Sequence, residues 1–87
     1  MNNVENIQEK ILEIINIAIE DVEISVEHSN DDLSQLGMDS ITFIRIVVAM
    51  EETFGIEVPD EYLLMTEMNT VDKFTNVITK TLVYEGR

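Results

Sequence analysis

The sequence predicts an all-α fold, and three observations indicate it. Apolar residues recur at steps of three and four over residues 3–19 and again over residues 71–83, which is the spacing of an amphipathic helix. A further run begins at Ser40, a residue type that caps helix N-termini, and is followed by Gly55, a type that closes C-termini. Strand-like alternation is confined to two short stretches, which alone would form only a marginal sheet in water. We therefore expect a small helical bundle.

The first predicted helix covers about residues 3–19. Glu5 and Glu9 lie near its start, where the positive end of the helix macrodipole favours them. Ile17 lies well off the apolar stripe. The stripe itself is made of Val4, Ile7, Ile11, Ile14, Ile15, Ala18, Ile19 and Val22.

Residues 20–39 predict a long extended loop between the first two helices. Val22, Ile24 and Val26 alternate with polar residues, and we expect these three side chains to pin the loop to the core. The stretch from Asp31 to Gly37 is typical of a helical turn that ends at its glycine. A connection of this length is uncommon in a compact domain and is usually functional when it is ordered.

Three further helices are predicted after this loop. The second covers about residues 40–54, with Ser40 as its N-cap candidate. A short third helix over residues 60–65 opens at Pro59, and a fourth over residues 71–83 is capped by Thr70. The expected architecture is therefore a four-helix bundle with a long loop between the first and second helices. The second helix is expected to turn these side chains to the core: Phe43, Ile46, Val47, Met50 and Phe54.

Composition bounds the class of protein. The chain has 87 residues with 5 basic and 18 acidic side chains, which gives a formal charge of −13. A single domain over residues 1–87 is expected, because a second would have too little interior. The charge argues against binding nucleic acid through its phosphates and against an anionic membrane surface. No apolar run approaches the ~18 residues of a membrane span, and the N-terminus lacks the pattern of a signal peptide. We expect a cytoplasmic monomer that does not insert into membranes.

The predicted helix over residues 40–54 is apolar on a second side as well. Residues 20–61 hold 12 acids and one base, a net charge of −11. An apolar strip ringed by charge is typical of a docking surface for a basic partner. The simpler interpretation is that the apolar residues fill gaps beside the loop and the acids form a solvated face. The outer side combines three aliphatic and three charged residues: Ile41, Ile44, Val48, Arg45, Glu51 and Glu52.

The residues around Ser40 carry the most specific signal. The run from Leu36 to Ile41 reads Leu-Gly-Met-Asp-Ser-Ile, and a run from Phe54 to Glu61 reads Phe-Gly-Ile-Glu-Val-Pro-Asp-Glu. With this spacing the sequence resembles the acyl carrier protein family, including the peptidyl and aryl carriers of modular synthesis. The similarity extends from about residue 4 to residue 82. The alternative is a structural capping serine on an unrelated bundle.

The resemblance implies a four-helix bundle in which Ser40 carries a covalent 4′-phosphopantetheine arm. The serine hydroxyl would attack the β-phosphate of coenzyme A with the help of a phosphopantetheinyl transferase. The arm would then hold acyl or aminoacyl cargo as a thioester. Asp39 matches the aspartate expected to engage the transferase, although it also suits the helix dipole. The other implied partners are loading and synthase enzymes with basic docking surfaces. We expect partners to contact Asp39, Ile41, Ile44, Arg45, Val48, Glu51 and Glu52.

Departures from the family pattern bear on the pathway. Thr42 and Arg45 stand where fatty-acid carriers usually show acids, whereas Met38 is more typical of acyl carriers than of embedded peptidyl carriers. We expect a freestanding carrier for a polyketide, nonribosomal peptide or related specialised pathway. Housekeeping fatty-acid synthesis is the alternative, and D-alanine transfer to teichoic acids is a third. Arg45 either sets partner choice or only makes a surface ion pair with Glu52 or Asp39.

The residues predict neither catalysis nor a metal site. The chain has no cysteine, and its one histidine, His28, lies in the loop without a paired nucleophile. The acids at Asp31 and Asp32 lack the glycine and terminal glutamate of a calcium-binding EF-hand loop. We therefore expect a carrier, not an enzyme. Two other classes stay open, an acidic mimic of nucleic acid and a plain protein adaptor, and neither needs the serine-centred motif.

Overall fold

The computed structural model describes residues 4–20 and 22–86. It contains three α-helices, α1 (Val4–Ala18), α2 (Ser40–Phe54) and α3 (Val71–Gly86). Three short 3-10 turns connect them, at Val26–His28, Leu33–Leu36 and Asp60–Tyr62, and the described residues form no strand. The all-α prediction is confirmed.

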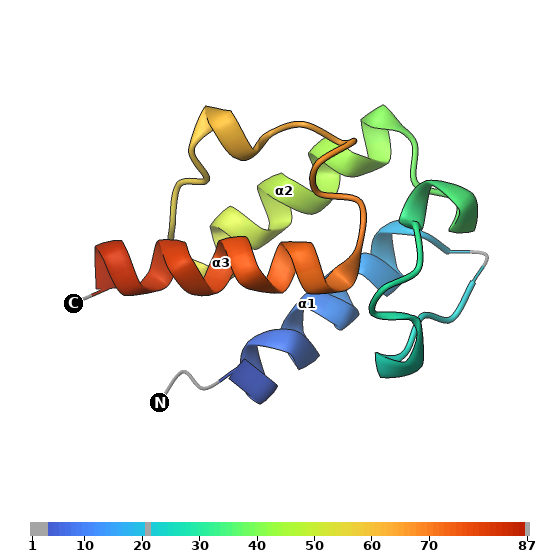
Figure 1. Ribbon diagram of the computed structural model, residues 1–87, viewed down its shortest axis with the longest axis horizontal. Coiled ribbons are helices and arrows are strands. Elements are labelled where there is room, and N and C mark those ends of the chain that lie inside the picture. Colours follow the sequence, from blue (N-terminus) through green and yellow to red (C-terminus); the bar gives the residue numbers. More distant parts are fainter. Residues whose placement is uncertain (1–3, 21, 87) are drawn as a thin grey trace.

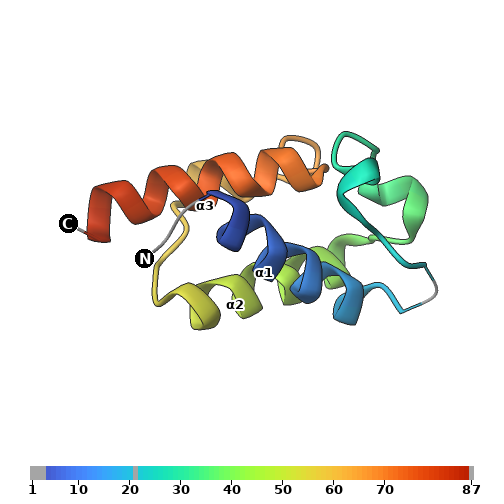
Figure 2. The same ribbon diagram turned by 90° about the horizontal axis from the view of Figure 1, so that it is seen from below.

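The first helix holds the bundle together, because α1 packs against both α2 and α3. Figures 1 and 2 show the long connection from α1 to α2 gathered at one end of the molecule, opposite the last turn of α3. The segment after α2 leads the chain back from the end of α2 to the start of α3, which lies toward the same end as the long connection (Figure 1). The start of α2 therefore lies between two connecting segments.

The core faces follow the spacing of the apolar residues, as predicted. Ile17, off the stripe, is 75% exposed. The rings of Phe43 and Phe74 join α2 to α3, with centroids 6.0 Å apart and planes tilted by 42°. Burial of one large aliphatic side chain contributes about 1.5–3 kcal/mol, so these faces are the main source of stability. The buried side chains of the helical stripes are Ile7, Ile11, Ile15, Ile19, Phe43, Ile46, Val47, Met50, Val71, Phe74, Val77 and Ile78.

Most helix boundaries agree with the sequence signals. The second helix begins and ends where predicted, and Gly55 closes it at φ 65°. The first ends at Ala18, one residue early, and its predicted start at residue 3 lies outside the described residues. Helix α3, which was predicted as a fourth helix over residues 71–83, runs to Gly86, three residues beyond the prediction. Thr70 caps it as expected, because its hydroxyl accepts the Lys73 N–H at 3.1 Å.

The prediction of a helix over residues 60–65 is wrong, and a four-helix bundle is not confirmed. Residues 60–62 form a 3-10 turn that ends at Leu63, whose backbone (φ −90°, ψ 45°) leaves the helical region. The side chains of Leu63 and Met65 pack against the core, whereas Leu64 between them is exposed. A helix cannot produce this alternation, because it turns residues i and i+2 to different sides.

The connection over residues 20–39 is pinned to the core, but by fewer side chains than predicted. Ile24 is buried and Val22 is partly buried. The prediction for Val26 is wrong: it is 59% exposed, because the 3-10 turn that begins there breaks the alternation. The Asn16 side chain adds a clamp, since it accepts the Ile24 N–H at 2.7 Å and donates to the Ile24 carbonyl at 2.8 Å.

Candidate functional site

The chain enters α2 through a turn, residues 33–39, that is fixed from inside. Leu33 is fully buried and Met38 is 2% exposed, and the Met38 N–H donates to the Leu33 carbonyl at 2.9 Å. Gly37 has φ 119°, and a Cβ there would lie 3.2 Å from the Ile19 side chain. Only glycine adopts this backbone without strain and makes this close approach to Ile19, the residue that follows α1. The position of the next residues is thereby set by the core.

The same turn is tied to the start of α3. The Leu33 N–H donates to the Asn69 carbonyl at 2.7 Å, and the Asp72 N–H donates to the Ser29 carbonyl at 3.0 Å. These bonds join the two connecting segments that flank the start of α2. The connection that leads into α2 is therefore held against the start of α3 as well as against Ile19, the residue after α1.

Asp39, not Ser40, is the N-cap of α2. Its backbone is extended, and its carboxylate accepts the Thr42 N–H at 2.8 Å. The expectation that Ser40 caps this helix is wrong, because an aspartate one residue earlier already supplies the capping oxygen. Ser40 is the first residue of α2 and is exposed, and its hydroxyl makes no hydrogen bond with the residues that the structure describes. The hydroxyl is therefore available for chemistry.

The charge at this helix end is stabilised locally. The bond from the Thr42 backbone N–H lowers the pKa of Asp39 below its ordinary value. In the preceding turn, hydrogen bonds from the Ser34 hydroxyl and from the Ser34 N–H lower the pKa of Asp32 in the same way. Both carboxylates act as caps, and a negative charge is favourable at a helix N-terminus. Asp39 is thus ionised beside the Ser40 hydroxyl at neutral pH.

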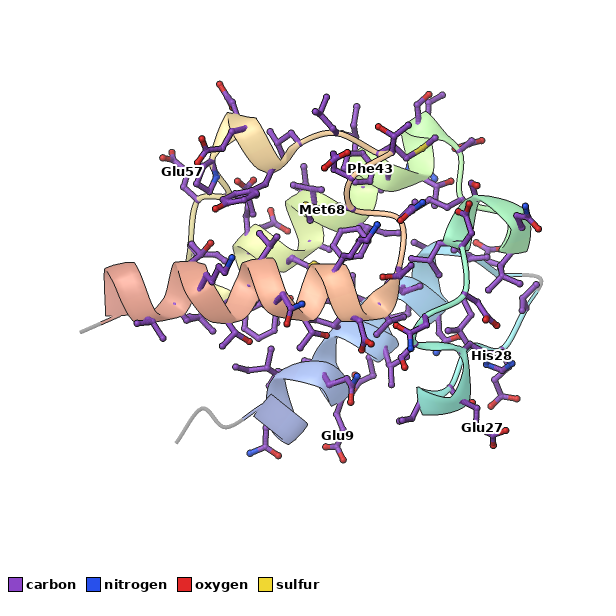
Figure 3. The ribbon with its side chains drawn as sticks, in the orientation of Figure 1. Glu9, Glu27, His28, Phe43, Glu57 and Met68 are labelled. Carbon is purple, nitrogen blue, oxygen red and sulfur yellow. The ribbon has the colours of Figure 1, made fainter. Side chains whose placement is uncertain are left out.

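A groove of about 480 Å³ lies between α2 and the segment 63–65. Only Ser40 and Glu51 among its lining residues are polar, and these two lie roughly 16.5 Å apart along the helix axis at 1.5 Å per residue. The lining residues are Ser40, Phe43, Ile44, Val47, Val48, Glu51, Leu63, Leu64 and Met65. Figure 3 shows Phe43 and Met68 inside the outline of the molecule, whereas Glu27, His28 and Glu57 lie on its rim.

The sequence did not reveal the second wall of this groove. Leu63, Leu64 and Met65 were assigned to a helix, so their alternation could not be seen. The one available signal was the run of three apolar residues itself, which is too long for one face of a helical turn. Only the structure shows that the backbone turns Leu63 and Met65 to the core and leaves Leu64 exposed on the wall of the groove.

Six of the seven predicted docking residues are part of α2, and the seventh, Asp39, is its N-cap. Ile41, Ile44 and Val48 are exposed by 64, 60 and 45%. Arg45 and Glu52 are exposed on the same helix. Glu51 differs, because it is partly buried and its carboxylate accepts the Val58 N–H at 2.9 Å. Glu51 therefore has a structural task in addition to any contact with a partner.

The remaining polar candidates form no second site. His28 accepts the Ser25 N–H at 3.0 Å through Nδ1, which closes its own 3-10 turn. Within residues 4–20 and 22–86, no group of three or more side chains is placed to hold a metal ion. No described helix is long and apolar enough to cross a membrane.

The comparisons with known proteins agree on one family. Residues 5–78 match the family model described as a phosphopantetheine attachment site. The chain is similar to the acyl carrier protein of Rickettsia bellii (strain OSU 85-389), with 30% identity over 82 residues that cover 90% of both chains. It is also similar to the acyl carrier protein of Helicobacter acinonychis, with 40% identity over 57 residues, 66% of this chain and 68% of the relative. No solved structure matches the chain significantly.

The family match indicates a covalently attached 4′-phosphopantetheine. The residues at the start of α2 fit such a group. Ser40 offers an exposed hydroxyl that has no structural task, so that esterification breaks no hydrogen bond among the described residues. The apolar groove begins at the same residue and can cover the apolar parts of a tethered molecule.

Proposed function

Because this chain belongs to the acyl carrier protein family, we propose that the Ser40 hydroxyl carries the 4′-phosphopantetheine arm. One observation carries the proposal, namely the setting of Ser40: it is exposed at the N-terminus of α2, its hydroxyl has no hydrogen bond with a described residue, and the apolar groove begins beside it. When bound, the arm supplies a terminal thiol that holds acyl groups as thioesters.

The other residues of the site have supporting roles in this proposal. Asp39 fixes the first turn of α2 and places a carboxylate where the transferase meets Ser40. Gly37 and Met38 anchor that turn to Ile19 and the core. The chain is proposed to carry intermediates without catalysing a reaction on them. Its partners are then a phosphopantetheinyl transferase and the loading and synthase enzymes that dock on α2.

The pathway is the finer part of the proposal. We favour a specialised pathway, polyketide or nonribosomal peptide synthesis or a related one, because Arg45 is exposed where a basic fatty-acid enzyme would meet it. Fatty-acid synthesis is the second candidate, favoured by the apolar groove beside Ser40, which suits aliphatic cargo. The names of the two relatives do not separate these candidates. The cytoplasmic location stays a prediction.

Intact mass spectrometry tests the attachment site. The purified protein is incubated with coenzyme A, magnesium and a broad-specificity phosphopantetheinyl transferase, and it is expected to gain one phosphopantetheine. Ser40→Ala should gain none. Ser34→Ala is the matched control, because Ser34 is also exposed beside a capping aspartate, and it should be modified like the wild type. Modification at another residue, or none in the wild type, would contradict the proposal.

A further inference from the structure

The outer side of α2 presents more apolar surface than a solvated helix needs. Ile41, Ile44 and Val48 are exposed, and Leu64 from the opposite wall of the groove is 55% exposed. We call these four residues the outer strip. Ile44, Val48 and Leu64 also line the mouth of the groove, so the strip crosses from one wall to the other. A partner that covers the strip also covers the groove.

Arg45 lies on α2 beside the outer strip, and its charge differs in sign from that of the surrounding sequence. It is the only basic residue between residues 20 and 61, a stretch that holds 12 acids. On the helix it lies one turn from Ile41 and one turn from Val48, and therefore on the same face. Its side chain is exposed.

The acids on α2 do not neutralise Arg45. No carboxylate among the described residues lies within 4.0 Å of its guanidinium. Asp39 directs its carboxylate to the Thr42 N–H, and Glu51 directs its own to the Val58 N–H. The surface ion pair with Asp39 or Glu52 considered from the sequence is therefore not formed. Arg45 therefore presents a positive charge without an ion-pair partner among the described residues, on the same helix face as the exposed apolar side chains Ile41 and Val48.

We propose that the outer strip docks on an enzyme surface that is basic overall but presents one carboxylate to Arg45. The inference rests on the proposed function, since only a carrier needs such a partner, and it adds the chemistry of that partner. Basic groups would face Glu52 and the overall negative charge of the chain, and an apolar hollow would receive Ile44, Val48 and Leu64. A partner with a wholly basic surface would place like charges together at Arg45, which costs binding free energy.

The net charge of the chain argues against a second copy of it as the partner that covers the outer strip. A second copy of this chain also carries a formal charge of −13, so two acidic faces would repel each other on contact. One arginine on each copy cannot offset that repulsion. The strip therefore fits a partner of opposite overall charge.

The first experiment compares charge variants of the carrier with a probe enzyme. The probe is a purified malonyl-CoA:carrier transferase of bacterial fatty-acid synthesis whose docking surface is basic throughout. All carriers are first converted to the phosphopantetheine form and checked by intact mass. We expect Arg45→Glu to raise kcat/KM on the order of tenfold, with Arg45→Gln in between. The matched control is Lys80→Glu, an exposed base on α3 with the same change of charge, and it should change kcat/KM less than about twofold.

The second experiment reverses charge on the probe. Each docking Lys or Arg of the transferase is changed to Glu in turn, and every variant is measured with the wild type and with Arg45→Glu. We expect one reversal to make the enzyme prefer the wild-type carrier, because its new carboxylate then faces Arg45. A double-mutant cycle built from these four combinations gives the interaction energy between Arg45 and the changed residue, separate from the effect of net charge.

The outcomes separate this inference from the proposed function. Absence of the mass gain at Ser40 would overturn both. A different set of results would overturn this inference alone. In that case Ser40 is fully modified, Arg45→Glu and Lys80→Glu change kcat/KM equally, and no charge reversal on the transferase makes it prefer the wild-type carrier. A concentration-dependent dimer in sedimentation experiments that Ile44→Asp dissociates would assign the strip to a second copy and would also overturn it.

Discussion

The two walls of the groove are built in different ways. The α2 wall is a regular helix of 15 residues, closed by Asp39 at its start and by Gly55 at its end. The facing wall, residues 60–68, has one 3-10 turn followed by irregular backbone. Among its side chains only Met68 is buried. Leu63 and Met65 pack against the core from partly buried positions, and just before the wall begins the Val58 N–H donates to the Glu51 carboxylate.

This difference separates two tasks of the site. Ser40 and Arg45 are on the wall whose geometry is fixed by its own i→i−4 hydrogen bonds. The wall of Leu63, Leu64 and Met65 has only turn bonds and few buried contacts, which are the properties of segments that open locally at low free energy. We infer that the helix keeps the proposed attachment serine and the proposed docking surface in place while the facing wall adjusts to what the groove contains.

The strongest test of this comparison truncates Met68, the one buried side chain among residues 60–68. Met68→Ala should lower the free energy of unfolding by about 2–5 kcal/mol, the range for truncation of a buried methionine. Met65→Ala removes the same atoms from a partly buried position on the same wall and should cost no more than about 1 kcal/mol. Urea titration followed by circular dichroism measures both. If both variants lower the free energy of unfolding equally, residues 60–68 are held along their whole length. The irregular wall would then be as firmly fixed as α2, which would contradict the comparison.

A second test addresses the two glycines that bracket the regular wall. Gly37 combines φ 119° with a neighbour 3.2 Å from the added Cβ, whereas Gly55 has φ 65° and open space. An alanine in a left-handed conformation costs about 1–2 kcal/mol. Gly55→Ala should fall in that range, and Gly37→Ala should exceed it, because the Ile19 side chain must also move. If Gly55→Ala is the more destabilising change in thermal unfolding, the turn before Ser40 is not fixed as described.

The regular wall could be predicted from the sequence, and the irregular wall could not. The bounds of α2 followed from Ser40 and Gly55, and its inner and outer faces followed from helical spacing, because local signals decide a long helix. The capping residue was missed, since Asp39 and Ser40 are equally good caps by type and only the backbone distinguishes them. The stretch 60–65 is too short for local preference to decide its shape, so packing of Leu63 and Met65 decided it. Ser40 was predicted from its motif and stays a proposed attachment site, whereas the exposure of Leu64 could be seen only in the structure.

The smallest expected effect concerns the charge at the start of α2. The Thr42 N–H holds the folded-state pKa of Asp39 below its ordinary value, so ionised Asp39 stabilises the folded state. Above about pH 5 this contribution is complete, because the carboxylate is ionised in both states. As the pH falls through the unfolded value near ~3.9 and then through the lower folded value, the contribution is lost.

Comparison with Asp39→Asn isolates this contribution, because asparagine keeps a capping oxygen but does not titrate. The wild type should be the more stable protein at pH 6, and the difference in melting temperature should shrink steadily toward pH 3. Asp31→Asn is the control for net charge, since the Asp31 carboxylate accepts no hydrogen bond from the described residues. Its difference from the wild type should change less over the same range. If the Asp39→Asn difference stays constant with pH, the capping bond to Thr42 does not depend on the charge of Asp39, and the start of α2 is held by the buried anchors of its turn alone.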